Sequence, residues 1–169
     1  MPLSGASIAV SAYAELSTTL DLGTGRAPQS LSRSVSLSSG TGPGQADRVW
    51  SDRRTLAASA NEDLDLAGVL LDAFGATVTF ARIKGLVIAA AKDNANSVII
   101  GGAASNPWPA LLGTTGTVTL RPGAFLAVGA GPADAGYAVT ASTGDLLRVA
   151  NGGSGTPVTY DVLLIGTSA

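Results

Sequence analysis

Short runs of alternating apolar and polar residues, separated by turns rich in glycine and proline, dominate this chain of 169 residues. A period of two places one side of an extended segment against a core and the other against solvent, so the pattern predicts β-strands. The clearest run, residues 157–165, carries large apolar residues on one face: Val158, Tyr160, Val162 and Leu164. About six or more such runs, roughly ten residues apart, predict an all-β fold, an antiparallel β-sandwich of the jelly-roll-like type.

Two pairs of runs predict β-hairpins. Residues 117–120 and 125–128 flank the turn 121–123, and residues 77–91 and 97–102 flank the polar loop 92–96. Within residues 77–91, a helix over residues 83–91 is the alternative, but Gly85, Val87 and Ile88 favour a strand. The one helical turn that we expect covers residues 66–74, a segment that fits a loop crossing between sheets equally well.

The N-terminal residues 1–45 permit two interpretations. Residues 6–21 and 27–37 alternate loosely, and the glycine-rich segment 38–44 separates them from a predicted sandwich core at 46–169. They form either an arm attached to the core or two further strands of the same sandwich. We favour the second, because a lone two-stranded hairpin is barely stable in water. A separate arm would be stabilised by contacts with other chains.

The composition excludes several classes of chemistry. The chain has no histidine and no cysteine, so Ser–His and Cys–His nucleophile pairs and ordinary zinc sites are ruled out. With only two glutamates and two lysines, the chain is poorly equipped for other acid–base catalysis. We assign no catalytic, cofactor-binding or metal-binding residue and expect no cofactor.

The charge of the chain argues against nucleic acid and membrane partners. The net charge is −2, and Arg53-Arg54 is the only adjacent basic pair, which leaves no electrostatic footprint for nucleic acid. No run approaches the ~18 apolar residues of a membrane-spanning helix. The N-terminus lacks the pattern of a secretory signal, so we expect synthesis in a cytoplasm.

The low charge content also bears on association. Charged residues make up 13% of the chain, about half the usual share of roughly 25%. Large neutral surfaces of Ser, Thr, Ala and Gly suit burial against neighbouring subunits. A monomer with a neutral surface is the alternative.

Two further motifs have plain structural explanations. Glu62, Asp63 and Asp65 supply oxygen ligands that suit calcium, but they lack the spacing of an EF-hand loop, and a solvated strand edge is the favoured interpretation. The segment 152–155 is rich in glycine but lacks the Lys-Ser/Thr ending of a phosphate loop, so we interpret it as a turn.

The segment 47–54 concentrates charge around an aromatic ring, and we take five of its residues as candidate subunit contacts: Arg48, Trp50, Asp52, Arg53 and Arg54. Trp and Arg are enriched at interface hot spots. An intramolecular ion pair beside a half-buried Trp50 explains the same residues equally well. Trp108, held between Pro107 and Pro109, is the sixth candidate. Its ring either forms a binding tip or, more commonly for such a residue, folds back over one end of the sandwich.

Six phrases of the sequence carry a family resemblance: the segment 53–68, Asp72-Ala73-Phe74-Gly75, the segment 98–106, Leu120-Arg121-Pro122-Gly123, Thr143-Gly144-Asp145-Leu146-Leu147 and Val158-Thr159-Tyr160-Asp161. Together they resemble a family of small structural proteins of tailed bacteriophages. The resemblance covers residues 46–169 and, more faintly, the segment 20–23. These phrases belong to a β-sandwich scaffold and contain no catalytic signature.

The resemblance implies a non-enzymatic virion component. Our leading expectation is a head decoration (cement) protein on the outer capsid surface, a homotrimer that bridges subunits of the major capsid protein through many weak contacts. The alternative is a receptor- or glycan-binding module of a tail tip or tail fibre, with Trp108 as its first candidate. A carbohydrate-active enzyme would need two suitably placed carboxylates, for which the sequence offers little support.

Overall fold

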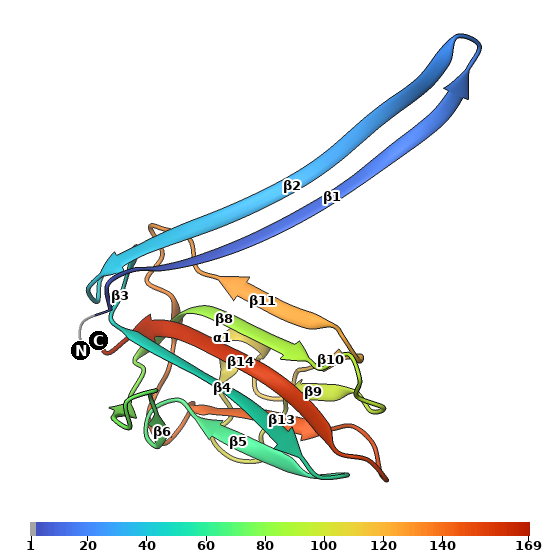
Figure 1. The fold of residues 1–169 in the computed structure, drawn as a ribbon. Coiled ribbons are helices and arrows are strands. Elements are labelled where there is room, and N and C mark those ends of the chain that lie inside the picture. Colours follow the sequence, from blue (N-terminus) through green and yellow to red (C-terminus); the bar gives the residue numbers. More distant parts are fainter. Residues whose placement is uncertain (1–2) are drawn as a thin grey trace.

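The computed structural model describes residues 3–169, and its body is a sandwich of two antiparallel sheets (Figure 1). Eight principal strands of the described chain build it: β4 (Arg48–Leu56), β5 (Asn61–Asp65), β8 (Arg82–Ala90), β9 (Val98–Gly101), β10 (Thr117–Leu120), β11 (Phe125–Gly129), β13 (Leu146–Asn151) and β14 (Val158–Thr167). The predicted all-β sandwich is therefore confirmed.

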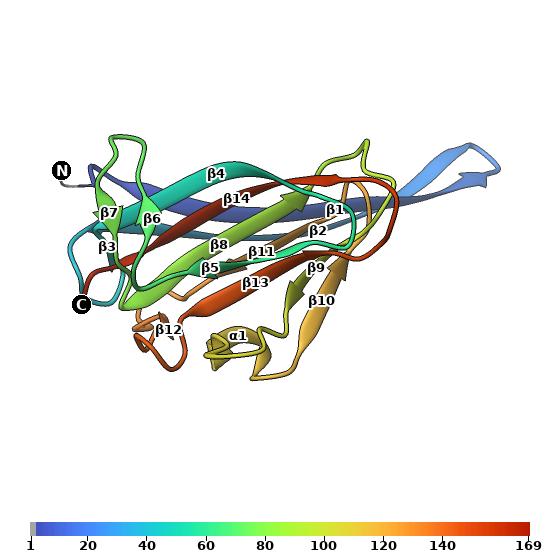
Figure 2. The same cartoon turned by 90° about the horizontal axis from the view of Figure 1, so that it is seen from below.

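The strand order is that of a jelly roll. One sheet runs β11-β8-β14-β4 and the other β10-β9-β13-β5. Consecutive principal strands cross from one sheet to the other at every connection except β9–β10, which stay paired in one sheet. This arrangement is the double Greek key that defines a jelly roll. Figure 2 shows the two layers from below.

The remaining elements are short or lie outside the sandwich. They are β1 (Ala6–Leu20), β2 (Gly23–Ser39), β3 (Gln45–Ala46), β6 (Leu70–Leu71), β7 (Thr77–Val78), β12 (Tyr137–Ala138) and the helix α1 (Pro109–Leu112). β12 extends the first sheet by pairing with β8, and β6 pairs with β7.

Both predicted hairpins are wrong. β10 and β11 lie in different sheets, as do β8 and β9, so the loops at 121–124 and 91–97 are crossings between layers. Alternation and turn residues mark where a strand ends, but they do not say which sheet the next strand joins. The strand expected over 77–91 is also interrupted, since β7 ends at Val78 and β8 begins at Arg82.

The predicted helical turn at 66–74 is absent as well. That segment forms turns and β6, which pairs with β7, on the way from β5 in one sheet to β8 in the other. This is the crossing loop named as the alternative. The helix of the described chain is instead α1, which follows Trp108 and has proline at its first position, where proline is well tolerated.

The core lies between the inner faces of the two sheets. In β14, residues 158, 160, 162 and 164 are buried as their alternation predicts, and Val98, Ile100, Leu147 and Val149 face them from the other sheet. The outer face of β14 is covered only in part. Ile165 is buried, but Leu163 is 36% exposed.

β1 and β2 pair with each other along their whole length and join β3, not a strand of the sandwich. The favoured expectation of two added sandwich strands is therefore wrong, and the pairing matches the arm that we named as the alternative. Figures 1 and 2 show this hairpin extending well beyond the body. We call β1 and β2 the arm.

A polar network joins the two sheets. The buried hydroxyl of Tyr160, on β14, donates to Glu62 Oε1 on β5 at 2.8 Å, and Arg54 Nη1 on β4 donates to Glu62 Oε2 at 3.1 Å. Burial chiefly, and then the bond to the Glu62 carboxylate, raise the pKa of Tyr160 far above its usual value. The neutral phenol is thus the form that the folded chain requires.

We predict a loss of stability in alkali that depends on Tyr160. The pKa of Tyr160 is about 10 in the unfolded chain and higher in the folded one. The folded state therefore binds more protons above pH ~10, and its stability falls as pH rises further. Urea unfolding between pH 8 and pH 11 should show this decline in the wild type and a smaller decline in Tyr160→Phe. Identical pH profiles would contradict the assignment.

Candidate functional site

Trp50, the central residue of the predicted contact segment, is a core residue. Its side chain is 2% exposed, and it packs in the cluster between the sheets. The guanidinium of Arg54 lies 5.6 Å from the centre of the Trp50 ring, and Arg54 also pairs with Asp52 and Glu62. These contacts match the intramolecular interpretation of the segment, except that Trp50 is fully buried where that interpretation has it half-buried. Trp50 and Arg54 hold β4 in place.

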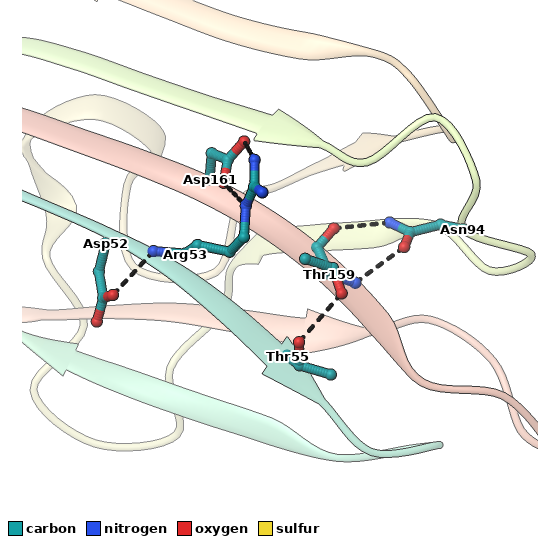
Figure 3. Close-up of polar contacts among 6 residues, drawn as sticks. All are labelled: Asp52, Arg53, Thr55, Asn94, Thr159 and Asp161. Carbon is teal, nitrogen blue, oxygen red and sulfur yellow. Dashed lines mark hydrogen bonds and ion pairs between the residues drawn. The ribbon is translucent and has the colours of Figure 1, made fainter.

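The other charged candidates lie on the surface of β4. Arg48 pairs with its neighbour Asp47 at 3.1 Å. Arg53 makes two bonds to the Asp161 carboxylate on β14, at 2.6 and 2.9 Å (Figure 3). This pair raises the pKa of Arg53 and lowers that of Asp161, mainly through the hydrogen bonds between them. Arg53 thus presents a satisfied ion pair on an exposed sheet face.

Trp108 folds back onto the body as the more common interpretation predicts. Its side chain is buried, its Nε1 donates to the Ala138 carbonyl at 2.8 Å, and its ring meets the Tyr137 ring edge to face. The ring therefore closes one end of the sandwich and is not displayed to a ligand.

The acidic cluster is also satisfied internally. Asp63 makes two bonds of 2.8 Å to Arg148 on β13, Glu62 bonds Tyr160 and Arg54, and Asp65 accepts the Ala67 N–H. Within residues 3–169, no group of three or more acidic, histidine or cysteine side chains is placed to hold a metal ion. β5 lies at an edge of its sheet, so the solvated-edge interpretation fits its position.

Residues 1–45 are expected to reach the capsid or an adjacent copy if they form an arm, but none of the six candidate contact residues lies in the arm. Its antiparallel register places directly opposed residues on the same face. One face is mainly apolar and carries Ala6, Ile8, Val10, Ala12, Ala14, Leu16, Leu20, Ala27, Leu31, Val35 and Leu37, together with Gly23, Gly25 and three polar residues, Thr18, Gln29 and Arg33. The other consists mainly of Ser and Thr, with Tyr13, Glu15 and Arg26. The arm is therefore a two-faced ribbon.

The root of the arm is the part whose apolar face is covered. Ile8 lies over two strand positions that carry no side chain. A Cβ at Gly129 would stand 2.6 Å from Ile8 Cγ2, and one at Gly85 would stand 3.1 Å from Ile8 Cδ1. Leu37 and Ile165 form a small second core there with Ala46. The root thus packs on the outer face of the β11-β8-β14-β4 sheet.

Beyond the root the same apolar face has no cover within the described chain. Val10, Leu16, Leu20 and Leu31 are all exposed, with Leu16 at 72%. We call residues 10–33 the distal arm. Exposed apolar side chains gathered on one ribbon face differ from the scattered apolar residues of an ordinary surface and mark an interaction site.

Lys84 fixes the base of the arm. It is buried on β8, and its Nζ donates to the Gly42 carbonyl at 3.3 Å and to the Asp134 carbonyl at 3.1 Å. Gly42 lies in the loop that joins β2 to β3. Burial lowers the pKa of Lys84, and the two carbonyls partly compensate the desolvated ammonium. Lys84 therefore ties the arm loop to the sandwich.

Comparisons with protein families, with curated proteins and with solved structures found no match to this chain. No helix among residues 3–169 has the length and apolar character needed to cross a bilayer. The arm and the sheet beneath it are therefore the features from which a function can be inferred.

We predict that Trp50 contributes mainly to stability. Trp50→Ala should lower the free energy of unfolding by about 3–5 kcal/mol, because it leaves a cavity between the sheets. Urea denaturation measures this loss. Val49→Ala is the matched control, since the neighbouring side chain is 39% exposed on the outer face and should cost far less. A Trp50→Ala chain as stable as the control would show that the ring is dispensable to the core.

We predict that Lys84→Met loosens the arm base without unfolding the sandwich. The backbone N–H of Gln45, which bonds the Gly42 carbonyl, and that of Ser38, which bonds Gly44, should exchange with solvent about tenfold faster. Hydrogen exchange followed by mass spectrometry tests this. Lys92→Met is the control, because Lys92 is exposed and pairs only with Asp93. Equal protection in both variants would refute the role of Lys84.

Proposed function

We propose that this chain is a non-enzymatic structural protein of a bacteriophage virion, a capsid decoration (cement) protein that binds the outer surface of the head. The observation that carries the proposal is the distal arm, an apolar ribbon face held away from the body by a well-packed root. Such an arm has no use in an isolated chain, because a two-stranded ribbon gains little stability unless another surface covers it.

The mechanism that we propose is distributed binding. A rigid sandwich contacts the capsid, and its arm spans to a neighbouring subunit of the assembly. Each contact is weak by itself, but linked contacts add by effective concentration and resist outward pressure on the shell. The resemblance of residues 46–169 to small phage structural proteins supports this proposal, as does the neutral surface of the chain. We propose two partners: the major capsid protein, and further copies of this chain, with which it forms a homotrimer.

The body of the protein suits such a role. Polar side chains of the sandwich bond one another. Tyr160 and Arg54 bond Glu62 across the two sheets, and Arg148 bonds Asp63 within one sheet. The burial of Trp108 removes the first candidate for a glycan-binding tip. The geometry therefore favours attachment through the arm over recognition of a sugar by an exposed ring.

The proposal predicts that purified protein co-sediments with capsids lacking it and not with isolated tails. Leu16→Ser/Leu31→Ser should weaken capsid binding at least about 100-fold, since burying each leucine contributes about 1.5–3 kcal/mol. Tyr13→Ser/Ser30→Ala, at opposed positions on the polar face of the same arm, is the matched control and should bind like the wild type.

Three outcomes would count against this function. Wild-type binding to tails in place of capsids would move the protein to the tail. Binding to neither particle would remove it from the virion. Equal loss in the two double variants would mean that the apolar face of the arm is not the attachment element.

A further inference from the structure

The outer face of the β11-β8-β14-β4 sheet is apolar beyond the point where the arm root covers it. The register aligns Gly129, Gly85, Ile165 and Val49 in one row across the four strands, and this row carries Ile8. The next row holds Ala127, Val87, Leu163 and Ser51, and the third holds Phe125, Ala89, Asp161 and Arg53. We call the second and third rows the receiving face.

The receiving face is open to a ligand. Phe125 is 64% exposed and Leu163 is 36% exposed. Val87, Ala89 and Leu163 line a shallow depression whose rim includes Arg53 and Asp161. The side chains of Arg53 and Asp161 bond each other, and the next row closes with a 3.0 Å bond between the Thr55 and Thr159 hydroxyls (Figure 3). The patch is therefore an apolar surface bounded by satisfied polar groups.

The arm root shows what fits this surface. The apolar face of the arm already packs on the first row of the same sheet face, with Ile8 over the two glycines. The distal arm continues that apolar face, yet it leaves the sheet and extends past the body (Figure 1), so it does not cover the receiving face of its own chain. The apolar face of the distal arm thus matches the receiving face in apolar character but does not contact it within the same chain.

Charge also selects the partner. The charges of Glu15, Asp21, Arg26 and Arg33 in the arm sum to zero. Of these, Arg33 lies on the apolar face, opposite Val10 next to the root. The receiving face carries one acid and one base, which pair with each other. Neither surface has the net positive charge that would attract a nucleic acid or an anionic membrane. A neutral apolar surface of matching shape is needed.

We propose that the distal arm of one copy docks, by its apolar face, on the receiving face of a second copy of this chain. This proposal deepens the proposed function by naming the neighbour that the arm reaches. The arm and the receiving face are different surfaces, so the contact is head to tail and closes into a ring when the rotation between copies allows. The homotrimer of the proposed function is one such ring.

The contact is expected to be weak between free copies. The distal arm spans 11 residues of β1, Val10–Leu20, so one face measures roughly 35 Å by 10 Å, or about 350 Å² per partner, at strand spacings of about 3.3 Å and 4.8 Å. A standard interface buries about 800 Å² per partner. Ring closure, or alignment on a capsid, would add the second contact that each copy lacks.

The absence of cysteine from the chain permits a direct test by cross-linking. Leu16→Cys in one chain and Leu163→Cys in a second chain of different mass place one thiol on each proposed surface. Both side chains are exposed, so neither change should affect folding. After mixing at about 100 µM and mild oxidation, we expect heterodimers at least fivefold above the control. In the control, Ser17→Cys replaces Leu16→Cys, on the opposite face of the same strand.

Three results would overturn the proposal. The first is an equal yield with Leu16→Cys and Ser17→Cys. The second is a dominant Leu16→Cys homodimer, which would indicate packing of arm against arm. The third is a wild-type chain that stays monomeric in sedimentation velocity up to several hundred micromolar. If the protein self-associates, Phe125→Ser and Leu16→Ser should each shift it toward monomer, whereas Ser17→Ala should not.

The capsid experiment separates the two proposals. A chain that fails these tests but still co-sediments with capsids would retain the proposed function and lose only the partner named here. A chain that cross-links as expected but ignores capsids would be an arm-linked oligomer with a different role.

Discussion

An apolar strand face must be covered, and this constraint organises the whole molecule. Alternation gives each strand one face to bury. In the sandwich the two sheets cover each other, with Tyr160 and Leu164 of β14 among the fully buried side chains between them. At the arm root, Ile8 and Leu37 find cover on the outer face of one sheet. Beyond Val10 no part of the described chain covers the apolar face of the arm, so Leu16 and Leu31 are exposed.

The direction of the arm depends on a small number of local contacts. Gly85 and Gly129 remove side chains where Ile8 must approach the sheet, so the ribbon lies close to the strands at that point only. Lys84 ties the β2–β3 loop to the sandwich through the Gly42 carbonyl. The arm is thus held at one end and uncovered along the rest, which is the geometry that the proposed contact with another subunit requires.

The charged and aromatic residues that stand out in the sequence serve the body of the protein. The sequence predicts Trp50 and Trp108 as contacts because large rings and arginines are frequent at interfaces, but both rings are buried in this fold. The arm contains one aromatic ring, Tyr13, and it lies on the polar face. The sequence pattern that marks the apolar face of the arm is the spacing of small and medium-sized apolar residues such as Ala12, Leu16 and Leu31. That spacing gains meaning only when the register shows that they share a face.

The sequence by itself determined that the chain is all-β, that β14 buries the face containing Tyr160, and that neither histidine nor cysteine chemistry is available. Alternation is a local property, and it is legible in a single strand. Only the tertiary structure decided that β10 and β11 separate into different sheets and that β1 and β2 pair outside the sandwich. Those choices depend on which distant strand supplies the hydrogen bonds and the opposing apolar face. The free energy of such pairings is set by contacts far apart in the chain, so no local pattern records it.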